Sequence, residues 1–298
     1  MDSPVTIRML NLRDIKVLHL EPTDVCQAAC ALCARETDKN FRKDLQHHLS
    51  MSQIVNVFDQ EKIQQLDKMF MCGYYGDPAA GKHTLDICRE FRKHNSNIVL
   101  GMNTNGGIQT TFWWHELGTI FNQAQDYVVF SIDGLEDTNR VYRKNVAWPK
   151  VMQNAQAFIA AGGSAHWDLL VYRHNQHQVE ACEQLARDMG FTWFRAKVSR
   201  RGFTDRLEQP IGWQLPHVQG TEVNCHALNE QSTYIDAQGR ENPCCWLGSR
   251  QKDFVTNFEE VKNSWTSIQP NIVCMSTCGT TSINTSFSQQ WQREIELC

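Results

Sequence analysis

The chain has 298 residues, of which 41% are hydrophobic and 21% charged, and its formal net charge at pH 7 is -4. This length allows one large α/β domain with a smaller one, and the acidic balance excludes a uniformly basic nucleic-acid-binding protein. No apolar run reaches the roughly 18 residues of a membrane span, and Arg8, Arg13 and Lys16 interrupt the stretch where a signal peptide would be apolar. We therefore expect a cytoplasmic protein without a membrane partner.

Short apolar runs alternate with amphipathic stretches along the first two thirds of the chain. Their patterns predict strands over residues 16–20, 68–73, 97–103, 126–132, 165–172 and 192–198. Helical spacing lies between them over residues 52–59, 84–94, 111–121, 149–161 and 176–189. Gly162 and Gly190 follow two of these helices, where a left-handed cap would end them. The alternation predicts an α/β fold with a parallel sheet curled into a partial (β/α)6, TIM-like barrel.

The pattern changes after the last predicted strand, so we expect three parts. Residues 1–200 would form the barrel, and residues 201–220, which carry Gly, Pro and charge without periodicity, a linker or substrate-side loop. Residues 221–298 form a cysteine-rich module that is too small for a good core of its own. Modules of that size often need metal to hold them together.

The chain has twelve cysteines, and their spacing indicates metal or cluster binding. Disulfide frameworks belong to short secreted chains, which this is not. Cys26, Cys30 and Cys33 form the pattern CxxxCxxC, and three such thiolates can hold three irons of a 4Fe-4S cluster and leave the fourth open for chemistry. The alternative is a zinc site, whose fourth ligand would be His47 or His48.

Three further cysteines stand alone in apolar or helical contexts. Cys72, Cys88 and Cys182 are expected to be small hydrophobic side chains rather than ligands.

The motifs after the triplet resemble those of the radical S-adenosylmethionine (SAM) enzymes. YYGDP follows the second predicted strand, and NTNG and FSIDG follow later ones. In that family the open iron chelates SAM, and electron transfer cleaves a carbon-sulfur bond to give a 5'-deoxyadenosyl radical that removes a hydrogen atom from the substrate. The resemblance implies a SAM-binding 4Fe-4S cluster on the triplet, SAM as cofactor, and a reductant protein such as flavodoxin or ferredoxin.

The resemblance also implies which residues contact SAM, at the strand ends where a parallel barrel binds ligands. Gly76, Asp77 and Pro78 occupy the place of the family's GGEP turn, which meets the methionine amino group. The positions that approach the ribose and methionine parts are Asn103, Asn105, Ser131 and Asp133, and Arg143 resembles an arginine found after the fifth-strand motif. Arg143 could instead be a solvated helix charge. Two positions depart from the pattern: Leu32 replaces an aromatic residue, and Asp77 replaces Glu.

The C-terminal cysteines resemble the twitch module, a shortened relative of the SPASM extension of radical SAM enzymes. Its implied ligands for one auxiliary 4Fe-4S cluster are Cys225, Cys244, Cys274 and Cys278. Four thiolates would close all iron corners, which favours an electron relay. Cys245 or Cys298 could replace one of them, and a four-cysteine zinc knuckle is the structural alternative.

The expected reaction is hydrogen abstraction from a small polar substrate, with a redox change such as dehydrogenation, and the expected enzyme class is an oxidoreductase. Only 25 residues precede Cys26, which favours a small molecule over a peptide. The alternatives are modification of a peptide or protein side chain, and a non-catalytic iron-sulfur or zinc module.

A basic group at the end of the last predicted strand has several interpretations. Its members are Arg195, Lys197, Arg200 and Arg201. They could neutralise a carboxylate of SAM or of the substrate, or form a solvated rim. Nucleic acid is not the expected partner, although a basic surface from Arg195 to Arg206 would allow a nucleic-acid modifier.

Overall fold

One curved sheet of eight strands organises the chain. The computed structural model describes residues 15–39, 41, 43, 46–199, 201–213, 222–250, 258–267 and 269–279. The strand order is β6-β5-β4-β3-β2-β1-β7-β8, and every neighbouring pair is parallel except β7 with β8. The strands are β1 (Val17–Leu20), β2 (Lys68–Met71), β3 (Val99–Thr104), β4 (Tyr127–Ser131), β5 (Ala165–Val171), β6 (Trp193–Val198), β7 (Ser232–Ile235) and β8 (Glu241–Asn242).

Helices connect the parallel strands. Before β6 they are α1 (Ala34–Thr37), α2 (Met51–Val57), α3 (Gln60–Gln65), α4 (Thr84–His94), α5 (Thr111–Ile120), α6 (Glu136–Tyr142), α7 (Trp148–Ala160) and α8 (Val179–Met189), with 3-10 turns η2 (Pro78–Ala80) and η3 (Gln176–Gln178). The C-terminal helices are α9 (His226–Asn229), α10 (Cys245–Arg250), α11 (Phe258–Ser264) and α12 (Ile272–Cys278). None of the helices in the described ranges is long and apolar enough to cross a membrane.

The predicted α/β class and the partial (β/α)6 barrel are confirmed. All six predicted strands and five predicted helices form, with ends within two residues of the expected ones, except that α8 begins three residues late because η3 occupies residues 176–178. Gly190 ends α8 with a φ of 84°, and Gly162 follows α7 with a φ of 94°, so both adopt the left-handed conformation expected of a glycine after a helix. The short helices α1, α3 and α6 were not predicted, because segments of four to seven residues show too little periodicity.

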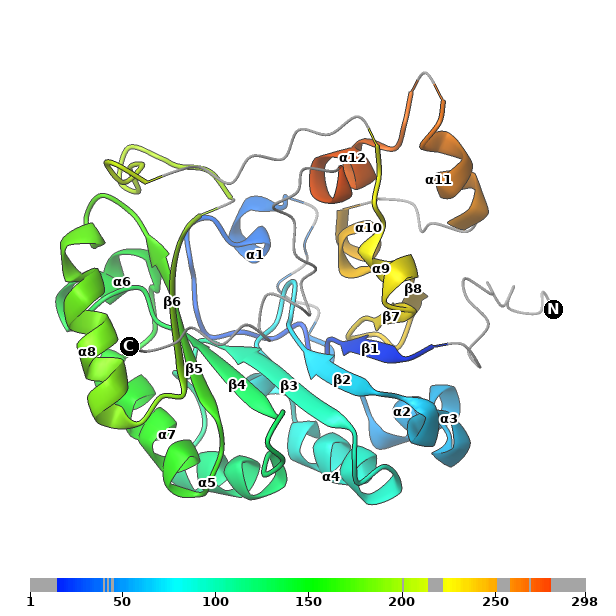
Figure 1. The fold of residues 1–298 in the computed structure, drawn as a ribbon, viewed down its shortest axis with the longest axis horizontal. Helices are drawn as coiled ribbons and strands as arrows, with labels where there is room; N and C mark the ends of the chain where they lie inside the picture. The colour runs from blue at the N-terminus through cyan, green and yellow to red at the C-terminus, as the bar shows by residue number, and fades with distance from the viewer. Residues whose placement is uncertain are drawn as a thin grey trace.

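The two faces of the sheet differ in chemistry because successive strand residues point to opposite sides. On the convex face, Leu18, Met69, Leu100 and Val128 are fully buried in the main core. Figure 1 shows α4, α5, α7 and α8 outside this face. On the concave face the pattern places His19, Phe70, Asn103, Ser131, Asp168 and Lys197, all of which line a cavity. A polar concave face therefore stands over an apolar convex one.

The C-terminal segment extends the barrel sheet instead of standing apart from it. Strand β7 pairs in parallel with β1, and Tyr234 lies opposite His19 in the register. Figure 1 shows the helices α10, α11 and α12 beyond β1, on the opposite side from β6. Their own core is small, with Leu247 and Cys274 as its buried members. The division into parts at residues 200 and 220 stays a prediction, and residues 214–221 lie outside the described ranges.

Candidate functional site

A cavity of about 840 Å³ lies at the carboxyl ends of strands β1 to β6 and extends to the C-terminal helices. Both groups of cysteines open onto it. The lining cysteines are Cys26, Cys30, Cys33, Cys72, Cys225, Cys244, Cys245 and Cys278. Cys274, the remaining predicted auxiliary ligand, is 7% exposed and belongs to the core of the C-terminal helices. Residues almost 200 positions apart therefore share one chamber.

The triplet lies on the loop between β1 and α1. The amide of Cys33 donates to the carbonyl of Cys30 over 2.9 Å, and Cys33 is the N-cap residue of α1. Burial raises the pKa of Cys26 to about 12, with smaller contributions from the charges of Asp77, Cys30 and Cys33. The three thiols thus lie close enough to interact electrostatically, in one loop that faces the cavity.

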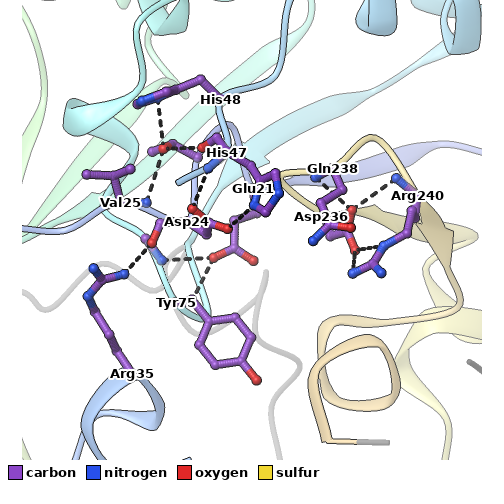
Figure 2. Close-up of polar contacts among 12 residues, drawn as sticks. Glu21, Asp24, Val25, Arg35, His47, His48, Tyr75, Asp236, Gln238 and Arg240 are labelled. Atoms are coloured by element: carbon purple, nitrogen blue, oxygen red, sulfur yellow. Dashed lines mark hydrogen bonds and ion pairs between the residues drawn. The ribbon is translucent and has the colours of Figure 1, made fainter. Parts of the chain in front are cut away.

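Buried acids hold the start of this loop. Glu21, which directly follows β1, accepts the amide hydrogens of Tyr75 and Gly76 over 2.7 and 2.9 Å. Figure 2 shows Glu21 and Tyr75 in this arrangement. Glu21 is 1% exposed. The turn after β2 is therefore tied to the strand that leads into the triplet.

A second acid, Asp24, ties the same loop to the segment before α2. Its carboxylate accepts the amide of His47 over 2.8 Å and pairs with His47 Nδ1 at 2.6 Å, and Arg35 donates to the Asp24 carbonyl oxygen (Figure 2). His48 contacts Thr23 Oγ1 at 3.0 Å. Neither histidine lines the cavity, so the structure does not bring the two residues of the zinc alternative to it.

Asp77 connects the turn after β2 to the NTNG segment after β3. Its carboxylate accepts hydrogen bonds from Ala79 N at 3.0 Å, Thr104 Oγ1 at 2.8 Å, Asn105 N at 2.7 Å and Asn105 Nδ2 at 2.6 Å. Asn105 Oδ1 in turn accepts Gln27 Nε2 at 2.7 Å, next to Cys26. Asp77 thus positions Asn105 in the candidate site. Its side chain is one methylene shorter than that of Glu and reaches all four donor groups.

Gly76 is required by close backbone packing in that turn. A Cβ atom there would lie 1.8 Å from the carbonyl oxygen of Thr23. Pro78 lies outside the cavity lining and begins η2, whereas Gly76 and Asp77 line the cavity. The three predicted turn residues therefore divide into two that face the chamber and one that shapes the turn.

Asn103 and Ser131 lie on the cavity wall at the ends of β3 and β4. The Oδ1 atom of Asn103 is buried and has no hydrogen-bond partner within the described part of the chain. A buried acceptor of this kind normally has a donor. A ligand with hydroxyl groups, such as a ribose, would supply one, so this wall fits a nucleoside.

Asp133 and Arg143 form a buried ion pair, with Arg143 Nε 2.6 Å from Asp133 Oδ2. Asp133 is 0% exposed, does not line the cavity, and also accepts Leu170 N over 2.7 Å. Arg143 lines the cavity and hydrogen-bonds to the sulfur of Cys30. The interpretation of Arg143 as a solvated helix charge is therefore wrong, and Asp133 orients Arg143 instead of facing a ligand.

The C-terminal cysteines also converge. The charge of Cys278 raises the pKa of Cys225, Cys244 and Cys274, in addition to the larger effect of burial. Cys245 lines the cavity next to Cys244, whereas Cys298 lies outside the described residues. Across the described ranges, no three Cys, His, Asp or Glu side chains are close enough to hold one metal ion.

Some residues were missed or misjudged from the sequence. Cys88 and Cys182 are fully buried, as expected, but Cys72 is half-buried and lines the cavity because it follows β2 on the concave face. His19, which also lines the cavity, was not predicted as a site residue. The signal that could have identified it is a histidine within an otherwise apolar strand. Its Nε2 lies 2.7 Å from the Cys72 carbonyl oxygen, and burial lowers its pKa to about 4.

Comparisons with known proteins agree with this geometry. The sequence profile of the radical SAM superfamily matches residues 20–186. A curated protein of Pyrococcus furiosus, the tungsten-containing aldehyde ferredoxin oxidoreductase cofactor-modifying protein, is 31% identical over 127 residues, which are 43% of this chain and 33% of that protein. This chain thus aligns with one third of that relative.

Solved structures share the fold. Streptococcus suis SuiB bound to S-adenosylmethionine has a TM-score of 0.55 at 13% identity, covering 81% of this chain and 63% of SuiB. The enzyme anSMEcpe, with bound AdoMet and a peptide, has a TM-score of 0.55 at 13% identity, covering 77% of this chain and 73% of its own. At such identity these likenesses show the fold alone, whereas the profile match extends over more than half of the sequence. The chain belongs to the radical SAM superfamily.

Proposed function

We propose that this radical SAM enzyme binds a 4Fe-4S cluster on Cys26, Cys30 and Cys33 and holds SAM beside it. When bound, SAM supplies on one-electron reduction a 5'-deoxyadenosyl radical that removes hydrogen from a substrate carbon. The chain's own residues position these groups. Asp77 and Asn105 would hold the methionine end, and the unpartnered oxygen of Asn103 would accept from the ribose.

The C-terminal cysteines would hold an auxiliary 4Fe-4S cluster in a twitch-like module. Cys225, Cys244 and Cys278 line the same cavity as the triplet, and this shared chamber is the single observation that carries the proposal. A cluster closed by four thiolates on the far side of the substrate can accept an electron from a product radical. The proposed net reaction is thus an oxidation, such as dehydrogenation of a small polar substrate.

Modification of a peptide side chain is the second candidate. Two proteins of similar fold have solved structures with peptides, SuiB with the precursor peptide SuiA and anSMEcpe with a bound peptide. The P. furiosus relative is instead named for modifying a cofactor. The volume of the cavity, about 840 Å³, lies in the range of sites that bind small molecules, which favours the small substrate. We place the reaction in the cytoplasm with flavodoxin or ferredoxin as reductant.

Anaerobic reconstitution with iron, sulfide, dithionite and SAM tests the proposal. We expect 5'-deoxyadenosine, and its absence from fully reconstituted protein would overturn the proposed SAM cleavage. An extract is then prepared from cells grown in deuterated medium, and it is separated by size into a peptide fraction and a small-molecule fraction. Deuterium transfer into 5'-deoxyadenosine from the small-molecule fraction supports the first candidate, and transfer from the peptide fraction supports the second.

A further inference from the structure

The wall of the cavity formed by β6 and the segment after it is basic. Lys197 and Arg201 both line the cavity, and Arg201 is exposed to it. Arg201 hydrogen-bonds to the side chain of Tyr142, which is itself buried. Among the described residues, Arg201 forms no ion pair with a carboxylate, so its charge is left for a ligand.

Lys197 shares its carboxylate partner, Asp168, with a second cation. Asp168, 5% exposed, lies opposite Arg195 in the β5–β6 register. Its two carboxylate oxygens accept Arg195 Nε at 2.8 Å and Lys197 Nζ at 2.5 Å. One carboxylate thus faces two cations, and Arg201 adds a third cation to the same region of the cavity wall.

The other described acids that line the cavity, Asp77 and Glu230, interact with other groups. Asp77 accepts four hydrogen bonds from the turn after β2 and the NTNG segment, as described above. Glu230 interacts with the charge of Lys68 at the opposite end of the barrel. Among the described residues that line the cavity, no carboxylate forms an ion pair with Arg201.

The basic wall adjoins the triplet on one side and Cys72 on the other. The charges of Cys33 and Arg143 act on Arg201, and the charges of Arg201 and Lys197 act on Cys72 at the end of β2. Cys72 also lies near Cys245 of the C-terminal module. Lys197 and Arg201 line the cavity together with Cys33, Cys72 and Cys245, and so lie beside the space where a substrate of the proposed reaction would lie.

We propose that Lys197 and Arg201 bind an anionic group of the substrate, a carboxylate or a phosphate, and so orient it between the two clusters. This assignment rests on the proposed function, because it takes the space beside Cys72 as the substrate's. Guanidinium and ammonium groups form charge-assisted hydrogen bonds with such anions, and these are the stronger ones in proteins. The substrate class is then an acidic metabolite or an acidic side chain.

The test uses the thiol of Cys72 as a reporter in the reconstituted holoenzyme under anaerobic conditions, and it needs no turnover. Iodoacetate carries a carboxylate and iodoacetamide does not, while both alkylate a thiol. The ratio of their rates at Cys72, measured by peptide mass spectrometry, is compared with the ratio for glutathione. We expect the wild-type ratio to exceed that of glutathione by about tenfold.

Three variants refine the test. Arg201→Gln and Lys197→Gln should lower the ratio toward that of glutathione, and Asp168 keeps Arg195 in the second variant. Arg206→Gln removes an exposed arginine of the same segment that does not line the cavity, and it should leave the ratio unchanged. Addition of acetate or of inorganic phosphate should slow the iodoacetate reaction, and the more effective anion identifies the group preferred.

Each contrary outcome overturns the proposal. A wild-type ratio equal to that of glutathione, or an equal loss in Arg206→Gln, would do so. The reactions are followed over long incubation, because burial raises the pKa of Cys72 to about 12 and leaves little thiolate. If saturating SAM abolishes the preference, the wall belongs to the carboxylate of SAM and not to the substrate. Failure of SAM cleavage is a separate result, because alkylation is measured without it.

Discussion

The hydroxyl of Tyr234 donates a hydrogen bond to the carboxylate of Glu21, a residue 213 positions earlier in the chain. Tyr234 lies on β7 and Glu21 directly follows β1, so the contact joins the C-terminal segment to the barrel. The same carboxylate holds the amides of Tyr75 and Gly76 in the turn after β2. One buried acid thus links the proposed auxiliary module to the proposed SAM site.

Protein stability should depend on pH through Glu21. Burial raises its pKa from 4.5 to about 7. Because the folded state binds this proton more tightly than the unfolded state, the contribution is fully present below pH 4.5 and is lost as pH rises to about 7, by about 3 kcal/mol. Glu21→Gln keeps an acceptor oxygen without titrating. Urea denaturation from pH 4.5 to 8 should show a flatter profile for this variant, and parallel profiles would contradict the assignment.

Tyr234→Phe should destabilise the protein more at pH 8 than at pH 5. The hydroxyl favours the charged carboxylate, so its removal leaves a buried charge with one donor fewer. We expect a loss in unfolding free energy of about 1–2 kcal/mol at pH 8. Tyr74→Phe is the control. Tyr74 also lines the cavity, but the hydrogen bonds of the Glu21 carboxylate come from Tyr75, Gly76 and Tyr234. Equal losses at both pH values would argue against the link.

Asp77→Asn should weaken both folding and SAM binding. All four partners of this carboxylate are donors, so an amide nitrogen must face two of them and those bonds are lost. The expected loss of stability is about 2–4 kcal/mol. SAM affinity, measured by anaerobic calorimetry, should fall about tenfold because Asn105 is released. Thr104→Val removes one donor only and should have the smaller effect on both quantities; a larger effect would refute this ranking.

Asp133→Ala should be strongly destabilising because it leaves the guanidinium of Arg143 buried without its partner. Removal of one member of a buried ion pair typically loses about 3–5 kcal/mol. The double variant Asp133→Ala/Arg143→Met should recover part of this loss in thermal denaturation while SAM affinity remains low. Full recovery of SAM affinity in the double variant would show that Arg143 has no part in the site.

Iron content should separate the two cysteine groups. Reconstituted wild-type protein should contain about eight irons per chain, and replacing the triplet by alanine should leave about four. Single alanine variants of Cys225, Cys244, Cys274 and Cys278 should each reduce the iron content, whereas Cys245→Ala and Cys88→Ala should retain it. Loss of iron in Cys245→Ala and retention in Cys244→Ala would reverse the assignment between these neighbours.

The local pattern of the chain was sufficient for the fold class. Strands and helices of the barrel are each signalled by residues within one short window, and the cap glycines Gly162 and Gly190 mark helix ends. The CxxxCxxC triplet could be read for the same reason, since its three ligands share one loop. By contrast, the sequence could not show that Asp133 lies away from the cavity lining. Its position depends on the hydrogen bond that it accepts from Arg143, ten residues later.

What the sequence by itself determined is therefore the alternating architecture and the presence of two cysteine groups. Only the tertiary structure decided that β7 pairs with β1, that both groups open onto one cavity, and that Cys72 lines it beside Lys197 and Arg201. The physical reason is distance along the chain. Local patterns record how neighbouring residues fold, whereas contacts between residues far apart depend on how the sheet curves and which strands meet at its end.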